Sequence, residues 1–223
     1  MHIFVSHGDQ KSKSSSKVKL MATLPNLLKE IRACRACESH LPHGPRPILT
    51  AHRSATILIA GQAPGRKVHE SGTPWDDVSG DRLRGWLGID RTTFYDTRKI
   101  ALIPMGFCYP GTGTSGDLPP RPECRKLWHH RLLPLLTEVT LTIVIGRYAQ
   151  AHYLGERQKH NLTATVHAWR EFSPTLFPLP HPSPRNQLWL KKNPWFASLL
   201  LPELKQAVAR ALRQATTARA SYK

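Results

Sequence analysis

The sequence contains no apolar run that approaches the roughly 20 residues needed to cross a membrane. This holds although 40% of its 223 residues are hydrophobic, which is enough for one core. A secretion signal is also missing, because residues 1–20 are mostly polar and rich in serine and lysine. These absences exclude membrane-spanning and secreted classes on sequence grounds. We therefore expect a soluble protein of the cytoplasm.

Acidic residues are scarce. The chain has 15 Asp and Glu against 32 Lys and Arg, which gives a formal net charge of +17. Such a charge favours polyanionic partners, either nucleic-acid backbones or anionic membranes. Residues 200–219 could form a basic amphipathic helix on a membrane, but they fit better a terminal helix docked on the protein. We expect nucleic acid as the partner and no membrane, with a basic protein that binds neither as the alternative.

No internal repeat is present, and short apolar runs alternate with helical patterns. Strands are predicted at residues 55–60, 100–105, 141–145 and 172–179, and helices at 24–33, 81–87, 121–136 and from Tyr148. This alternation predicts an α/β fold, with a central four-stranded, mainly parallel sheet between two helical layers. We expect a disordered basic tail at 1–22, one domain at 23–205, and a basic helix end and tail at 206–223.

Sites in such sheets lie beyond the carboxyl ends of the strands. The predicted strands are followed there by the loops 61–77, 108–120 and 181–186. In the first loop, Gly61 and Gly65 allow close approach of a ligand, and Gln62 offers an amide to a water or a base. In the last loop, His181 can donate to a developing anion, and Ser183 can hold a phosphate. Either loop, taken alone, is equally compatible with an ordinary structural turn.

Only four cysteines occur. Cys34 and Cys37 form a C-x2-C pair at a predicted helix end, whereas Cys108 and Cys124 are widely spaced. Disulfides are disfavoured without a secretory context. A zinc ribbon would need a second closely spaced pair, and four thiolates from separated loops suit an iron–sulfur cluster at least as well. The spacing favours iron–sulfur over zinc, with unrelated buried cysteines as the third alternative.

The loops and the cysteines together resemble the uracil-DNA glycosylase superfamily, closest to its iron–sulfur branch, family 4. That branch has G-E-A-P-G after a strand, then G-x-P-F and H-P-S, with a C-x2-C pair and two further cysteines. The matching segments occur here in the same order, over roughly residues 24–204: Gly61–Gly65, Gly72–Trp75, His181–Ser183 and all four cysteines. The resemblance implies the fold of this superfamily and DNA as substrate.

The resemblance also implies site residues. Catalytic candidates are Gln62, His181, Asp76 and Asp77, of which the two aspartates are replacement acids. The base pocket would be formed by Gly61, Ala63, Pro64, Gly65 and Trp75. DNA contacts are expected from Pro182, Ser183, Arg185, Lys191 and Lys192, with Arg121 and Arg125 as further candidates. A structural 4Fe-4S cluster, less favourably zinc, would be held by Cys34, Cys37, Cys108 and Cys124.

Four positions depart from the pattern of the family. Gln62 replaces the acid of G-E-A-P-G, and His69 replaces an acid four residues past that loop. Trp75 replaces the phenylalanine that stacks on the base. Pro104 stands where the family has the asparagine that reads the edge of uracil, and it carries no hydrogen-bonding side chain. The chain therefore resembles a divergent branch.

These observations predict a DNA-repair glycosylase for uracil or another deaminated base, acting as a monomer near the bacterial nucleoid. Two alternatives remain at this point. The first is a catalytically weak or silent nucleic-acid-binding member of the same superfamily, which Gln62 and Pro104 favour. The second is a non-enzymatic, zinc-stabilised interaction protein.

Overall fold

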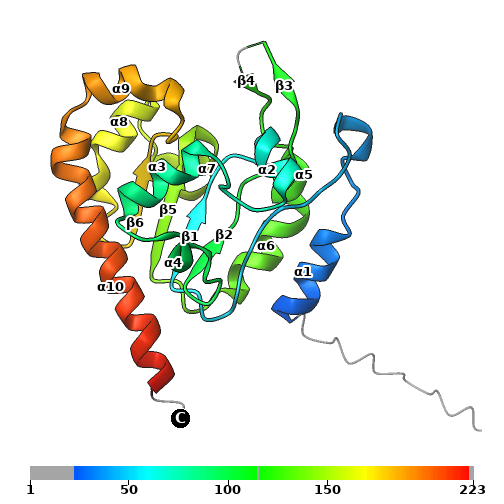
Figure 1. Cartoon of the computed structure of the whole chain (residues 1–223), viewed down its shortest axis with the longest axis horizontal. Helices are drawn as coiled ribbons and strands as arrows, with labels where there is room; N and C mark the ends of the chain where they lie inside the picture. The colour runs from blue at the N-terminus through cyan, green and yellow to red at the C-terminus, as the bar shows by residue number, and fades with distance from the viewer. Residues whose placement is uncertain (1–22, 115, 221–223) are drawn as a thin grey trace, which may run out of the picture.

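The computed structural model describes residues 23–114 and 116–220, of which 215–220 are described by their backbone only. Its centre is a parallel sheet with the strand order β2-β1-β5-β6 (Figure 1). The bounds are Ile57–Ala60 for β1, Ile100–Leu102 for β2, Leu141–Ile145 for β5 and Leu176–Leu179 for β6. Strand β1 is a continuous apolar run and β5 is interrupted only by Thr142, as expected where helices cover both faces. The predicted fold class is confirmed.

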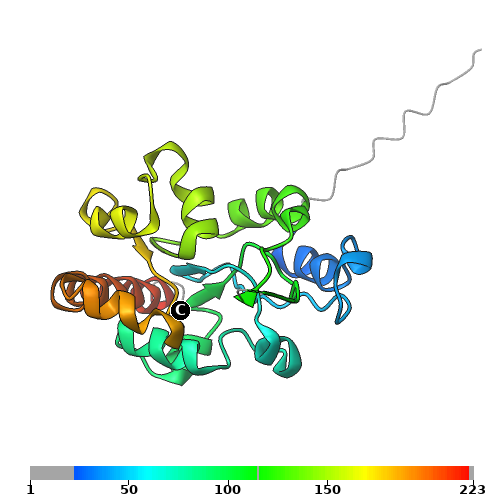
Figure 2. The same ribbon diagram turned by 90° about the horizontal axis from the view of Figure 1, so that it is seen from above.

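Helices form a layer on each face of the sheet (Figure 2). On one face, α3 (Val78–Leu87), α4 (Arg91–Tyr95) and α10 (Leu201–Ala220) share a core with Ile57 and Ile59. On the other, α1 (Leu24–Arg32) and α6 (His130–Leu132) pack with Leu58, and α7 (Gly146–Leu154) packs with Ala60. Successive strand residues point to opposite faces, so the four residues of β1 serve both cores. The remaining helices are α2 (Arg66–Ser71), α5 (Pro122–Cys124), α8 (Leu162–His167) and α9 (Gln187–Lys192).

Three strands are shorter than predicted: β1 begins at Ile57 instead of Ala55, and proline explains the other two differences. The last strand begins at Leu176 instead of Phe172, because residues 172–175 form a turn that contains Pro174. Pro178 is tolerated inside β6 because β6 is an edge strand. Strand β2 ends at Leu102, two residues before Pro104, which has no N–H for the ladder.

The helix predicted at 121–136 is present as one helical segment with irregular turns. It consists of α5, a π-helical stretch at Arg125–His129, α6 and a final 3₁₀ turn at Leu133–Leu135. Helix α10 continues through the expected boundary at residue 206, and the predicted tail at 1–22 lies outside the described residues. Within the described part of the chain, no helix has the length and apolar character needed to cross a membrane.

One buried histidine gives the fold a dependence on pH. His129 is 1% exposed, it stacks on Phe107 at 5.2 Å, and neither ring nitrogen has a hydrogen-bond partner among the described residues. Burial, with the nearby charges of His152 and Arg125, lowers its pKa to about 4, and the nearby backbone of Pro104 and Met105 opposes part of this shift. The neutral ring is therefore favoured in the folded protein. This contribution to stability is complete above pH 6.5 and is lost as the pH falls toward 4.

We expect His129→Phe to reduce the loss of unfolding free energy that occurs when the pH is lowered. The wild type should lose about 2 kcal/mol of unfolding free energy between pH 7 and pH 5 through this residue alone, from the shifted pKa. The variant should lack that loss, since phenylalanine keeps the stacking and does not titrate. Urea unfolding at both pH values measures the difference, with the exposed neighbour His130→Phe as control. An identical pH dependence in His129→Phe and wild type would contradict the assignment.

Candidate active site

The carboxyl ends of β1, β2 and β6 border one pocket of about 290 Å³. The loop after β1 contributes Gly61–Gly65, and the loop after β6 contributes His181, Ser183 and Arg185. Further lining comes from Trp75 and Asp77 before and at the start of α3, and from a hairpin formed by β3 (Thr112–Gly113) and β4 (Gly116–Asp117). The structure thus brings together the first and last loops that the sequence singled out.

The Gly61–Gly65 loop is fixed by backbone hydrogen bonds that continue the sheet. Met105 N–H donates to the Gly61 carbonyl at 2.9 Å, and Gly106 N–H donates to that of Gln62 at 2.9 Å. The Gln62 side chain turns to the hairpin, where its Nε2 donates to the carbonyl of Leu118 at 3.2 Å. This bond fixes the amide, so the Gln62 Oε1 is the atom left to accept a hydrogen bond from a ligand or a water.

Trp75 is held in an unusual backbone conformation at the pocket wall. Its φ of 57° is the only positive value among the described non-glycine residues. The neighbouring carbonyl of Pro74 accepts a bond from the Tyr95 hydroxyl at 2.9 Å, and the Trp75 carbonyl accepts one from Arg84 Nη1 at 3.4 Å. The indole lies over Gly61, where an added Cβ would come within 2.9 Å of the ring. A left-handed residue with a large side chain is kept only where its surroundings enforce it.

His181 lies beside this indole, with ring centroids 5.7 Å apart. Its Nδ1 accepts a hydrogen bond from the Ser183 N–H at 3.2 Å, and its carbonyl accepts one from Asn186 Nδ2 at 2.7 Å. Burial lowers the pKa of His181, and the negative charge of Asp77 opposes part of this shift. A neutral imidazole that accepts at Nδ1 carries its proton on Nε2. The ring is therefore a donor that needs no positive charge.

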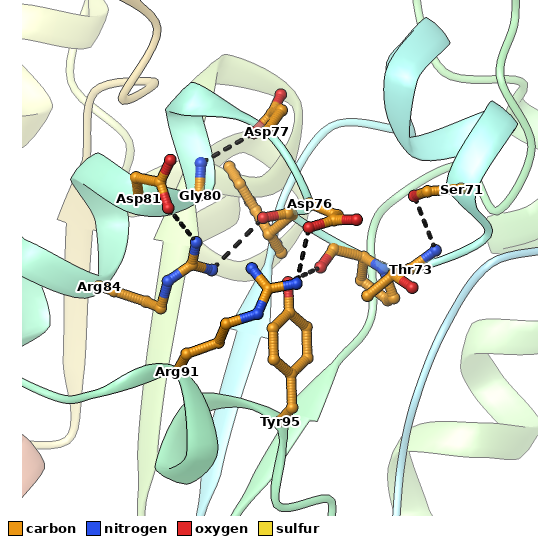
Figure 3. Close-up of polar contacts among 11 residues, drawn as sticks. Ser71, Thr73, Asp76, Asp77, Gly80, Asp81, Arg84, Arg91 and Tyr95 are labelled. Carbon is orange, nitrogen blue, oxygen red and sulfur yellow. Dashed lines mark hydrogen bonds and ion pairs between the residues drawn. The ribbon is translucent and has the colours of Figure 1, made fainter.

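The two adjacent aspartates predicted as replacement acids have different surroundings (Figure 3). Asp77 lines the pocket and caps α3, where it accepts from Gly80 N–H at 2.8 Å. Asp76 is absent from the pocket lining and pairs with Arg91 at 2.8 Å, which lowers the pKa of the Asp76 carboxyl. Asp81 pairs with Arg84 at 2.5 Å. Asp77 is thus the predicted acid that the structure brings to the site.

Asp117 is a pocket residue that the sequence reasoning missed. It comes from β4, and partial desolvation at the pocket wall raises the pKa of its carboxyl, an effect opposed by the charge of Arg185. The signal was available, because Asp117 is the only charged residue in the 108–120 loop. It was overlooked because no motif surrounds it, and pairing of the hairpin is needed to turn it toward Gly65.

The floor of the pocket, formed by three apolar residues, has no polar side chain that could read a base edge. Ile48, Leu102 and Pro104 line it, and Pro104 has neither an N–H nor a polar side chain. His69, at the other departure from the family pattern, does not line the pocket. It lies against Tyr109 with ring centroids 6.0 Å apart. The polar groups of the pocket therefore gather at its mouth and walls.

The predicted DNA-contacting residues divide into two sets. Ser183 and Arg185 line the pocket, and Pro182 lies buried between His181 and Ser183. Lys191 and Lys192 are near the end of α9 and are absent from the lining. Two basic residues that were not predicted, Arg66 and Lys67 at the start of α2, line it as well. Arg121 pairs with Glu123 and lies beside Cys37, so it belongs to the cysteine cavity and not to the pocket.

All four cysteines line a second, narrow cavity, together with apolar residues such as Phe107 and Trp128. Each is a free thiol, and Phe107 N–H donates to the Cys124 sulfur at 3.3 Å. Burial raises the pKa of Cys108 to about 11 and that of Cys124 to about 12. Among the described residues, no group of three or more His, Cys, Asp or Glu side chains is arranged to hold a metal ion. The donor set, four thiols from three segments around one cavity, is nevertheless the set that an iron–sulfur cluster requires.

A comparison with protein-family models gives one match, described as the uracil DNA glycosylase superfamily, over residues 48–205. The matched segment is more than half of the chain. It contains all four strands of the sheet and every residue that lines the pocket. Cys34 and Cys37 lie before it, and Cys108 and Cys124 lie inside it.

Proposed function

Because the chain belongs to the uracil DNA glycosylase superfamily, we propose that it is a DNA base N-glycosylase. It would hydrolyse the bond between deoxyribose and uracil, or another deaminated base. The observation that carries this proposal is His181, a neutral histidine whose Nδ1 is engaged, so that Nε2–H is a donor at the pocket. A leaving base becomes anionic as its glycosidic bond breaks, and a fixed donor stabilises that charge.

The pocket supports the earlier steps of such a reaction as well. A glycosylase must first turn its target base out of the stack, at a cost of a few kcal/mol. Stacking on the Trp75 indole would offset part of that cost, by about 1–3 kcal/mol. The mouth of the pocket carries Arg66, Lys67 and Arg185, which suit the phosphates that flank an extruded nucleotide.

The test is an oligonucleotide panel that carries uracil, hypoxanthine or xanthine in single and double strands. Release of at least one of these bases by the purified protein, with an intact strand carrying an abasic site, is the expected result. Absence of base release across the whole panel would contradict the proposal.

A second candidate function is nucleic-acid binding without cleavage. The apolar floor formed by Ile48, Leu102 and Pro104 favours it, since this floor offers no polar side chain that would select a base. The same panel separates the two functions when binding is measured beside cleavage. Tight binding of several oligonucleotides without base release would favour this second candidate.

We further infer that Cys34, Cys37, Cys108 and Cys124 hold a 4Fe-4S cluster. The four thiols around one cavity support this inference, as does the apolar lining, which limits access of water. The bound cluster would tie the segment before β1 to α5, and it has no step in the reaction. Arg121, beside Cys37, would balance part of the negative charge of the thiolates.

Purified protein should show broad visible absorbance, and Cys124→Ser should lose most of it. Cys124 is 6% exposed, and serine offers a poorer ligand than thiolate. We expect the variant to unfold at a lower denaturant concentration too, because metal binding contributes directly to folding free energy. Iron, sulfide and zinc analysis of both proteins accompanies the spectra. A colourless wild type that contains stoichiometric zinc would overturn the cluster in favour of the zinc alternative.

A further inference from the structure

The hairpin β3–β4 comes from the sequence between Cys108 and Cys124 and projects beyond the carboxyl ends of the central strands (Figure 1). Its residue Asp117 lines the pocket. Thr112 pairs with Asp117, and Gly113 pairs with Gly116. Leu118 N–H then donates to the Gly111 carbonyl at 2.9 Å, which closes the base of the hairpin. Asp117 is therefore presented by a paired backbone segment, which fixes the direction of its side chain.

One hydrogen bond and two close approaches place this hairpin against the pocket. Gln62 Nε2 donates to the carbonyl of Leu118, the residue after Asp117. The Asp117 Oδ2 lies 3.3 Å from the position of a Cβ added to Gly65, so the carboxylate rests against the Gly61–Gly65 loop. The Arg185 guanidinium lies 2.7 Å from the position of a Cβ added to Gly116. The hairpin thus joins the first and last loops of the site.

Within the described part of the chain, the Asp117 carboxylate makes no contact that stabilises the fold. It forms no hydrogen bond or ion pair with the side chains or backbone of the described residues, although Arg185 and Asp77 act on it electrostatically. It remains exposed to solvent at the pocket wall. By contrast, Asp77 is occupied as the cap of α3 and Asp76 is paired with Arg91. Among the three acids, Asp117 has both of its oxygens free.

We propose that Asp117 is the general base that activates the attacking water, with Gln62 Oε1 as the second acceptor that orients it. This inference rests on the proposed glycosylase function and names a catalytic residue for it. The Asp117 carboxylate and the Gln62 amide are held near each other. The Gln62 side chain donates to the carbonyl of Leu118, which is the residue next to Asp117. Asp117 thereby supplies the acid that Gln62 lacks.

The bond between C1′ and the base nitrogen breaks, and its electron pair leaves with the base, whose negative charge accepts a hydrogen bond from His181 Nε2–H. The water oxygen forms a bond to C1′, and one water proton passes to the Asp117 carboxylate. The Asp117 proton is then released to solvent, and the departing base takes up a proton from solvent. The products are the free base and a 1′-hydroxyl deoxyribose, with no oxidant or further reactant.

The test compares single-turnover base release and DNA affinity for Asp117→Asn with wild type, on the substrate that wild type cleaves best. We expect the rate to fall about 100-fold, the lower end for loss of a general base. DNA affinity should change less than three-fold, because the amide keeps the shape. For Asp117→Ala, added formate should restore part of the rate by supplying a carboxylate, which no structural role would predict.

Asp90→Asn is the matched control. It makes the same change of carboxylate to amide at the cap of α4, away from the pocket, and asparagine caps a helix as well as aspartate does. Wild-type cleavage together with an Asp117→Asn rate within three-fold of it would overturn the role of Asp117 and leave the glycosylase function standing. Failure of wild type on the whole panel would overturn both. A matched fall in rate and in unfolding midpoint, without rescue by formate, would also count against Asp117 as the base.

Discussion

Replacing His181 with alanine is expected to lower the single-turnover rate of base release by about 10²–10³-fold, the typical cost of one donor to a developing anion. His181 is positioned on both sides, by Ser183 N–H at its Nδ1 and by Asn186 at its carbonyl. Its lowered pKa keeps the ring neutral at physiological pH. The Nε2–H donor therefore does not need to lose the strongly bound water that surrounds a charged group. The loss should appear in the rate of the chemical step, while DNA affinity stays within a few fold.

His160→Ala serves as the control for this prediction, because His160 is exposed and does not line the pocket. Asn186→Ala adds an intermediate case. It removes the hydrogen bond to the His181 carbonyl without touching the ring, so its rate should fall less than that of His181→Ala. A His181→Ala rate within three-fold of wild type would remove the observation on which the proposed function rests.

The central strands could be predicted from sequence because burial on both faces leaves a continuous apolar run. The runs ending at Ala60 and Ile145 are of this kind, and both strands end where they were predicted. The extents of the outer strands depend on proline as well. Pro104 and Pro174 lie within runs that look apolar enough to be strands, and the missing N–H of proline determines where pairing can occur.

The site could be predicted only where residues follow a strand end directly. Gln62 and His181 do so, and both line the pocket. Asp76 and Asp77 could not be told apart by sequence, because their roles depend on which of them caps α3. Asp117 is the only charged residue of its loop, but its place in the pocket could not be predicted. A two-residue strand in a glycine-rich loop has no hydrophobic pattern, so nothing in the sequence predicted its approach to Gly65.

Gly80→Ala, in the helix behind Trp75, is expected to lower the unfolding free energy by about 3 kcal/mol through overpacking. A Cβ at residue 80 would overlap the carbonyl oxygen of Trp75 and lie 2.7 Å from its carbonyl carbon. Neither atom can move cheaply, because Arg84 binds that carbonyl and Asp77 holds the Gly80 N–H (Figure 3).

Gly85→Ala in the same helix makes the same chemical change without the overlap. No atom lies within 4 Å of a Cβ at residue 85, and the position is exposed. This variant should gain up to about 1 kcal/mol, the helix propensity of alanine over glycine. Urea unfolding of both variants measures the contrast. Base release by folded Gly80→Ala should also be slowed, since Trp75 would have to leave its place over Gly61. Equal stability of the two variants would show that the left-handed conformation of Trp75 does not depend on the missing side chain of Gly80.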